Sequence, residues 1–362
     1  MNSRIEQFKN RLITYLEIKG MSRYEEPVAD ELRKNIDTKI FNVSRDKLGS
    51  IIFHKSSKKV NAPKVMITAH MDEVGYLVRL IHDKGQLLLS PVGGIWPSVV
   101  IGTKATLIAS NNQEFDGVFG HTSIHIMESS KVSKAITSDE IYADFGFKNK
   151  QDAIDNGVEI GDRVYLSGET VFFKNYDLIG GKAMDNRAGV TVLETIANII
   201  KDYELDIDLY LVGTVQEEVG TRGARSSVSI INPDIAIALD TTSSHDTIDT
   251  IPGTTQLFKG AAIRVKDGGT LMDPKLINYF EKISQKYNIP SYKFIAAGGG
   301  TDAKELQFAK GGASTITISL PQRYLHSPIG VCSISDLLAA TDLLVNFLKD
   351  LNKEEFDKIK YN

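Results

Sequence analysis

Four short apolar runs in this chain each lead to an acidic residue or a histidine. They are VMITA (65–69) before His70, LYLVGTV (209–215) before Glu217, IAIAL (235–239) before Asp240, and STITISL (314–320), which leads toward His326. Apolar runs of this length are typical of buried strands in a largely parallel sheet. Because ligands of open α/β sheets bind beyond the carboxyl ends of the strands, we expect these four polar segments to converge.

Helical patterns lie between the strand-like runs, which predicts an α/β fold. Residues 186–201 carry apolar side chains on one helical face, and residues 335–351 repeat the pattern with Ser335 placed to cap the helix. The N-terminal stretch predicts an amphipathic helix that ends at Gly20. A chain of 362 residues, 42% of them hydrophobic, is long enough for one large domain with an insertion.

Residues 74–172 have a different pattern. They contain short strand-like pieces punctuated by Gly, Ser and Asn-Asn, namely GQLLLSPVGG (85–94), IGTKATLIAS (101–110) and VEIGDRVYLSGE (158–169). This predicts a β-rich insertion at 74–172 in a discontinuous α/β domain formed by 1–73 and 173–362. Such a module commonly serves assembly or substrate gating, and the pattern does not distinguish the two.

The segments at the strand ends contain side chains of the kind that bind metals. His70 and Asp72 lie in AHMDEVG, Asp185 in KAMDNRAG, Glu217 and Glu218 in TVQEEVG, Asp240 in IALDTT, and His326 in RYLHSP. A two-metal hydrolase needs a bridging carboxylate, imidazole and carboxylate ligands, and one unligated carboxylate to move protons. Since neighbouring side chains of an extended chain point in opposite directions, one of the two adjacent glutamates can hold a metal while the other stays free.

Each of these residues also has a structural interpretation. Asp185 alone would most simply cap the helix at 186–201, but it can cap and ligate together only by dividing its oxygens, so the cap can fall to Asn186 instead. A lone histidine after a strand is usually structural, whereas a carboxylate such as Asp72 close to His70 can orient the ring of a ligand. The coincidence of five ligand-type segments at element boundaries favours the metal site.

Two other patterns give weaker signals. His121 and His125 would share one face of a strand in the alternating HTSIHI, but no third ligand accompanies them, which favours a role other than metal binding. The segment 298–301 (GGGT) lacks the Lys-Ser/Thr ending and the following helix of a phosphate-binding loop. We interpret it as a glycine loop that lets a substrate approach the backbone closely.

Composition excludes several classes of partner. The net charge is −4 and the basic residues are not clustered, so no nucleic-acid footprint is present. No apolar run approaches the roughly 20 residues of a membrane helix, and the N-terminus does not resemble a signal peptide. The single cysteine, Cys332, excludes an intrachain disulfide and fits a reducing compartment. We therefore expect a cytoplasmic protein.

As an ordered set, the motifs resemble those of the tetrahedral metallo-aminopeptidases, family forty-two of the metallopeptidases, which includes the bacterial glutamyl aminopeptidases. The motifs that carry the resemblance are AHMDEVG, KAMDNRAG, VQEEVGTRGA, the Asp after IAIAL, GGGTDA and RYLHS, and they span nearly the whole chain. The resemblance implies a di-zinc aminopeptidase-like catalytic domain with a central mixed sheet, interrupted by a β-rich dimerisation domain. It also implies homo-oligomeric shells of twelve subunits that act on small peptides.

The resemblance further implies a role for each site residue. Asp185 bridges two divalent metal ions, His70 and Asp240 complete one site, and Glu218 and His326 complete the other. Glu217 is the general base and then the general acid, while Asp72 steadies His70. Zinc is the first expectation for this mixture of imidazole and carboxylate ligands, and cobalt or manganese suit the same set. The stretch TTSSHD after Asp240 departs from the continuation expected of the glutamyl enzymes, so no substrate-binding residue is assigned.

Three alternatives remain open at this point. A related two-metal deacylase or carboxypeptidase would share the ligands and would not require a free α-amine on its substrate. A glycoside hydrolase needs two carboxylates and no metal-binding histidines, so His70 and His326 argue against it. A non-enzymatic scaffold would be indicated by the loss of a ligand or of Glu217, and none is lost.

Overall fold

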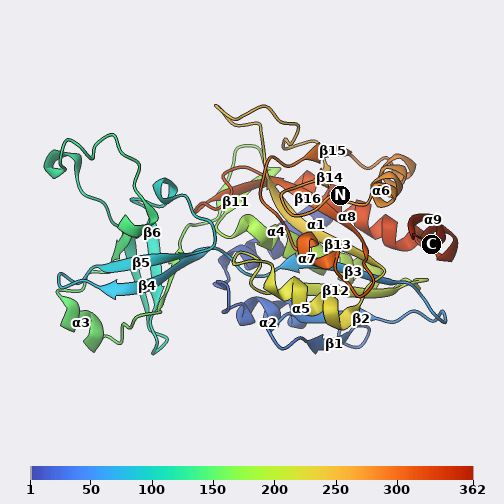
Figure 1. Ribbon diagram of the computed structural model, residues 1–362, viewed down its shortest axis with the longest axis horizontal. Helices are drawn as coiled ribbons and strands as arrows, with labels where there is room; N and C mark the ends of the chain where they lie inside the picture. The colour runs from blue at the N-terminus through green and yellow to red at the C-terminus, as the bar shows by residue number, and fades with distance from the viewer. Residues whose placement is uncertain (1, 362) are drawn as a thin grey trace.

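The computed structural model describes residues 2–361 and consists of two parts. A large α/β core carries both ends of the chain, and a smaller β-barrel projects from one side of it (Figure 1). The barrel strands lie within the segment predicted as a β-rich insertion. The prediction of a mixed α/β fold with an inserted β-rich unit is therefore confirmed, whereas the exact domain boundaries at 73/74 and 172/173 stay a prediction.

The core is built on an eight-stranded mixed sheet. In spatial order its strands are β1 (Asn42–Arg45), β2 (Ile51–Lys55), β12 (Asp208–Thr214), β3 (Lys64–His70), β13 (Ile235–Ser243), β16 (Ser314–Gln322), β14 (Ala261–Lys266) and β15 (Ser291–Ile295). The four central strands, β12, β3, β13 and β16, are parallel to one another, and the outer strands add antiparallel pairs. The four apolar runs of the sequence are these four central strands, which are almost entirely buried because helices cover both faces of the sheet.

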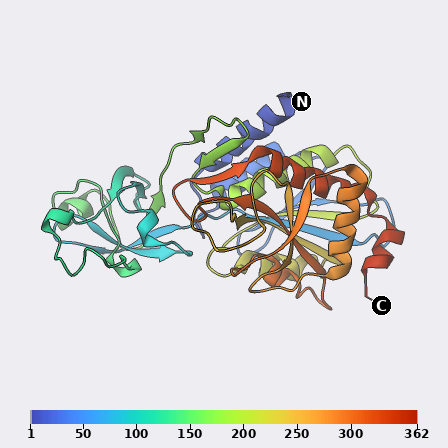
Figure 2. The ribbon, with the colours of Figure 1, turned by 90° about the horizontal axis from the view of Figure 1, so that it is seen from above.

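Helices lie in a layer on each side of this sheet (Figure 2). One layer holds α1 (Asn2–Glu17), α4 (Met184–Ile200) and α8 (Ile334–Asp350), with α6 (Pro274–Tyr287) and α9 (Lys353–Ile359) farther along it. The other holds α5 (Arg222–Ile231) and α7 (Ala303–Leu306), and α2 (Glu26–Asn35) lies near the edge strands. A small antiparallel sheet of β10 (Val171–Phe172), β11 (Leu178–Gly181) and β17 (Gly330–Ser333) leads into α4 and α8.

The starts of helices α4 and α8 test the predicted N-terminal caps. Of the two candidate caps, Asn186 caps the regular part of α4, because its Oδ1 accepts the backbone N–H of Gly189 at 3.0 Å, and both Asp185 and Asn186 have non-helical backbone angles. The prediction that Ser335 caps α8 is wrong. The cap is Ser333, whose Oγ accepts the backbone N–H of Asp336, and the helix begins one residue before Ser335.

The barrel closes on itself and has its own hydrophobic core. Its strands are, in spatial order, β4 (Gly75–Ile81), β5 (Leu87–Val92), β8 (Tyr142–Asp144), β7 (Glu114–Phe119), β6 (Lys104–Ile108) and β9 (Arg163–Leu166), and one short helix, α3 (Lys150–Asp155), packs beside them. Every neighbouring pair of these strands is antiparallel. Closure leaves no free sheet edge in the barrel, which suits a small unit that stands apart from the main core.

The segment HTSIHI does not form the strand that its alternation predicted. It lies in a long exposed connection of the barrel, where Ile124–Ile126 forms a short 3-10 helix. Both His121 and His125 are exposed there, with no buried face to share.

Candidate metal centre

Five chain segments with ligand-type side chains meet at the carboxyl ends of the central strands around a cavity of about 730 Å³. His70 ends β3, Asp240 lies in β13, and the turn after β12 carries Glu217 and Glu218. Asp185 stands at the start of α4, and His326 follows β16. The convergence expected from the parallel strands is therefore present, because the register sets His70 beside Thr214 and places the strand ends side by side.

The ligand-type side chains fall into two groups that share Asp185. In the first group, His70 Nε2 lies 3.1 Å from Asp185 Oδ1 and 3.5 Å from Asp240 Oδ1. In the second group, His326 Nε2 lies 3.2 Å from Asp185 Oδ2 and 3.3 Å from Glu218 Oε1. Within each group one ligand atom per residue lies within 4.8 Å of the others. The two oxygens of Asp185 thus face two different imidazoles, which is the arrangement that a carboxylate needs to bridge two cations.

The outer nitrogen of each imidazole is engaged by an oxygen. His70 Nδ1 lies 3.1 Å from the backbone carbonyl oxygen of Asp72, and His326 Nδ1 lies 2.6 Å from the carbonyl oxygen of Gly94. A carbonyl oxygen can only accept, so Nδ1 carries the proton in both rings. In the neutral ring the lone pair is then on Nε2, which faces the carboxylates, and this is the tautomer that a metal ligand requires.

The charges of the cluster suit divalent cations. Burial raises the pKa of Glu218 and Asp240, which opposes the ionised form of both. Burial alone would lower the pKa of His326, but its contacts with Asp185 and Glu218 raise it to about 11. Oε1 of Glu218 is buried and has no hydrogen-bond partner among the described residues, although His326 Nε2 is close to it. Crowded carboxylates around two imidazoles, with one oxygen left without a hydrogen bond, are the donor set of a metal site.

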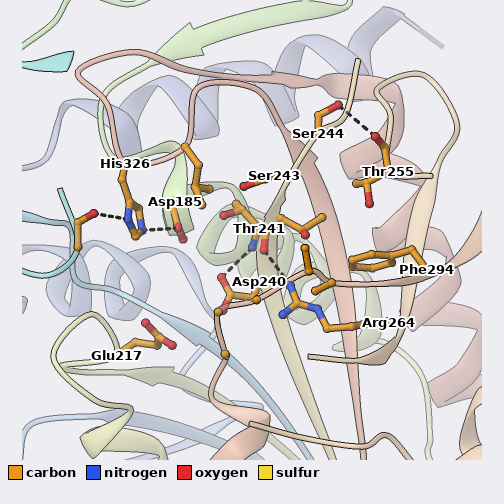
Figure 3. A pocket seen from close by; sticks show the side chains of 18 of the residues that line it. Asp185, Glu217, Asp240, Thr241, Ser243, Ser244, Thr255, Arg264, Phe294 and His326 are labelled. Atoms are coloured by element: carbon orange, nitrogen blue, oxygen red, sulfur yellow. Dashed lines mark hydrogen bonds and ion pairs between the residues drawn. The ribbon is translucent and has the colours of Figure 1, made fainter. Parts of the chain in front are cut away.

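Glu217 lines the same cavity without joining either group. Figure 3 shows Glu217 and His326 on one side of the cavity, with Arg264 and Phe294 on the other. Burial raises the pKa of Glu217 well above its ordinary value; His70 lowers it in part, and the neighbouring carboxylate of Asp240 raises it further. A carboxylate with a raised pKa in a buried cavity is suited to accept and return a proton.

The premise that the two glutamates lie on an extended chain is wrong. They lie past the end of β12 in a turn, where the backbone N–H groups of Gly220 and Thr221 both donate to the carbonyl oxygen of Glu217. The side chains nevertheless differ, since Glu218 faces His326 and Glu217 does not. The turn, not strand alternation, separates them.

Asp72 organises both this turn and His70. Its Oδ1 accepts the backbone N–H of Glu217 at 3.0 Å, and its Oδ2 accepts the N–H of Glu218 at 3.2 Å and the hydroxyl of Ser22 at 2.6 Å. Oδ1 also lies 3.4 Å from His70 Nδ1. Burial would raise the pKa of Asp72, but these contacts, led by His70, lower it, so the carboxylate stays ionised although no part of it reaches solvent.

Sequence reasoning missed three contributors to the site. Asp302 of GGGTDA is buried and accepts the Thr214 hydroxyl at 2.6 Å, and burial raises its pKa to about 6. Arg264, from β14, lines the cavity, and Gly94 enters it from the barrel. Only Asp302 lay in a recognisable motif; the other two are brought to the site by long-range packing that no local pattern encodes.

The segment TTSSHD, which departs from the expected family pattern, forms a wall of the cavity with Thr241–Ser244 and His245. Asp246 of this segment accepts two hydrogen bonds from Arg323, of 2.9 and 2.7 Å. Arg323 lies three residues before His326 in the sequence. The predicted glycine loop, 298–300, also lines the cavity, and a side chain there would meet no other atom within 4 Å.

A mixed α/β sheet with paired imidazole and carboxylate groups at its carboxyl end defines the class of metal-dependent hydrolases that includes the metallopeptidases. Comparison with known proteins narrows this class. The model of the M42 glutamyl aminopeptidase family matches residues 49–343, and the chain belongs to this family. It is a metal-dependent aminopeptidase.

Individual relatives are similar to this chain over nearly its full length. The chain is 34% identical to the glutamyl aminopeptidase of Lactococcus lactis over 345 residues, which cover 95% of this chain and 96% of that protein. The aminopeptidase of the archaeon Desulfurococcus kamchatkensis has 30% sequence identity and a TM-score of 0.93, with 99% of each chain covered. The Pyrococcus horikoshii TET1 peptidase, which can assemble into a tetrahedron or a large octahedral shell, has 27% identity and a TM-score of 0.83 over 95% of this chain and 100% of its own.

Among residues 2–361, no helix is both long and apolar enough to span a bilayer.

Proposed function

We propose that this chain removes N-terminal residues from small peptides with two divalent metal ions and with Glu217 as the general base. The observation that supports this most directly is the pair of contacts made by Asp185, whose two oxygens face His70 and His326 separately. Glu217 lies in the same cavity and belongs to neither group.

The donor set suggests which residues would hold each ion. His70, Asp185 and Asp240 would hold one, and Asp185, Glu218 and His326 the other. Zinc suits this mixture of imidazole and carboxylate ligands best, and cobalt or manganese would also fit. When bound, such ions lower the pKa of a coordinated water and polarise a peptide carbonyl.

The chain's own groups would then handle the proton. Glu217 accepts the proton of the attacking water and returns it to the nitrogen of the leaving amine. The raised pKa of Glu217 makes it a stronger base than an ordinary carboxylate, which favours uptake of the water proton. Asp72 holds the turn that carries Glu217 and keeps the ring of His70 oriented.

The charge of the cavity wall favours an acidic N-terminal residue on the substrate. Beyond the carboxylates of the two ligand groups and Glu217, no acidic side chain is among the described residues that line the cavity, whereas Arg264 and Lys304 are. Arg264 gives one hydrogen bond each to Ser319, Asp267 and the carbonyl oxygen of Thr241, which leaves two of its five N–H groups outside these bonds. Lys304 is exposed at the same wall. A substrate carboxylate would meet the ammonium group of Lys304 and the two remaining N–H groups of Arg264, whose charge is paired with buried Asp267 at 3.1 Å.

We also propose that the chain works as a homo-oligomer, a dodecamer assembled from dimers through the β-barrel. Two solved structures of relatives support a homo-oligomer, since one contains a dodecamer and the Pyrococcus horikoshii TET1 peptidase can assemble into a tetrahedron or a large octahedral shell. So do the large apolar side chains that the barrel exposes, which include Ile124 and Ile126.

The test is peptide hydrolysis by protein from which metal has been removed and then restored. We expect chelation to abolish the hydrolysis of peptides with a free N-terminus and added zinc, cobalt or manganese to restore it. Peptides with an acetylated N-terminus are the matched control and should resist the enzyme in every metal state. Full activity in verified metal-free protein would contradict the mechanism, and equal cleavage of the acetylated peptides would indicate a deacylase or an endopeptidase.

A further inference from the structure

The two histidines of the candidate metal centre are held very differently. His70 is the last residue of β3, and 2% of its side chain is exposed. His326 lies beyond the end of β16 with a φ of +52°, and 27% of its side chain is exposed. The first ligand group is therefore fixed by strands of the core, while the second depends on what holds the segment around His326.

The contact that orients His326 comes from the barrel. Its Nδ1–H donates to the carbonyl oxygen of Gly94 at 2.6 Å, across 232 positions of sequence. Gly94 lies in the connection between β5 and the short 3-10 helix Pro97–Val99, both within the barrel. Within residues 2–361, this is the hydrogen bond that His326 Nδ1 makes, so the core partners of the ring, Asp185 and Glu218, both face its other nitrogen.

The same connection also lies against Glu218. Gly93 has a φ of +85°, and a Cβ added to it would lie 2.7 Å from Val74 Cγ1 and 3.3 Å from Glu218 Cβ. The barrel backbone therefore passes directly beside both residues that distinguish the second ligand group from the first. A glycine is needed at position 93, both for its backbone conformation and for the close approach.

We propose that the barrel loop Gly93–Trp96 positions the second ligand group, so that binding of the second divalent ion depends on the barrel while binding of the first does not. This inference rests on the ligand groups of the proposed function. It makes the barrel a part of the metal centre in addition to any role in assembly. Gly94 acts through His326 and is a positioning residue.

The test compares two glycine substitutions in the barrel. Gly93→Ala forces the loop away from Val74 and Glu218, whereas Gly102→Ala has a similar positive φ of +75° but no atom within 4 Å of the added Cβ. Zinc affinity of the full-length metal-free protein is measured by competition with a chelator, and bound zinc is counted by elemental analysis. We expect Gly93→Ala to weaken the second ion about 10- to 100-fold, the range found when the partner of a ligand is disturbed, and to leave the first unchanged. Gly102→Ala should match the unmodified protein for both ions.

The chain offers a second readout that needs no substitution. Trp96 is its single tryptophan, is 66% exposed, and lies two residues after Gly94. The unmodified metal-free protein is titrated with zinc. The fluorescence of Trp96 should change when the ion of the second ligand group binds and stay constant when the ion of the first group binds. This measurement decides the question if Gly93→Ala does not fold.

Three outcomes would overturn the inference. They are unchanged affinity for both ions in folded Gly93→Ala, equal weakening of both ions, and Trp96 emission that follows the first ion or neither. If the unmodified protein binds fewer than two ions, the ligand groups of the proposed function fail, and this result is distinct from the three above.

Discussion

The carboxylate of Asp72 accepts the backbone N–H of Glu217 at 3.0 Å, although 145 positions separate the two residues. The same carboxylate holds the N–H of Glu218 and faces the ring of His70. The buried side chain of Asp72 therefore fixes His70, Glu217 and Glu218 relative to one another. The interpretation of Asp72 as a residue that only steadies His70 was too narrow.

Replacement of Asp72 by Asn should therefore damage more than one function. The amide has one accepting oxygen, and its NH₂ group must face a backbone N–H that now has no acceptor. We expect kcat to fall about 10- to 100-fold and the affinity for the first metal ion to weaken, as for other residues that orient a ligand. Steady-state kinetics and zinc competition measure both effects.

Ser22→Ala is the matched control for this substitution. It removes one hydrogen bond to Asp72 Oδ2 but leaves the carboxylate in place. Its effect should be confined to a loss of about 1 kcal/mol in the free energy of unfolding. If Ser22→Ala lowers kcat as much as Asp72→Asn does, the contacts of Asp72 with Glu217 and His70 do not explain the loss of activity.

Lys304→Glu should change which N-terminal residue is preferred. The substitution reverses the charge of the exposed cation in the cavity wall, so we expect kcat/KM for N-terminal Glu substrates to fall about tenfold while that for N-terminal Leu substrates changes little. High salt should reduce the difference, because exposed charges are screened. Chromogenic Glu, Leu and Lys derivatives serve as substrates.

Lys310→Glu is the control, because Lys310 is exposed on the same segment and does not line the cavity. It should leave the ratio of the Glu and Leu rates unchanged. A strong preference for N-terminal Lys in the unmodified enzyme would contradict the proposed acidic specificity.

Assembly should depend on the exposed apolar side chains of the barrel. The unmodified protein should have a mass of about twelve times the 39.9 kDa chain in light scattering, and the double substitution Ile124→Asp and Ile126→Asp should reduce it to that of smaller species. Ile248→Asp is the control. Ile248 is a strongly exposed residue of the α/β part of the molecule, outside the barrel, and its replacement should not change the mass. A monomeric unmodified protein, or a double variant with unchanged mass, would contradict the role of the barrel.

Local patterns predicted the features that are encoded locally. Apolar runs identified the central strands, and the parallel arrangement of those strands explains why His70, Asp240 and the segment before His326 meet at one edge of the sheet. The change of pattern from residue 74 onward identified the β-rich insertion. Asn186 was one of two candidate caps that the sequence offered, because this signal lies within three residues of the helix start.

Features that depend on distant contacts could not be read in this way. The turn at Glu217 is held by Asp72, and the ring of His326 by Gly94, through contacts that span more than a hundred positions. The helix start at Ser333 was missed for a related reason. Asp177 accepts the hydroxyls of both Ser333 and Ser335, so the folded surroundings decide which of two nearby serines caps the helix.

The two adjacent glutamates give the most direct test of the mechanism. Glu217→Gln keeps the size of the side chain but removes the base, so turnover should fall about 10²- to 10⁴-fold with two zinc ions still bound. Glu218→Gln removes a charged ligand candidate that lies 3.3 Å from His326, so it should weaken one ion as well as slow turnover. The deciding measurement is zinc content beside kcat for both variants. We predict two bound ions in Glu217→Gln and a lost or weakened ion in Glu218→Gln; loss of zinc from Glu217→Gln with both ions kept in Glu218→Gln would contradict the account and exchange the two roles.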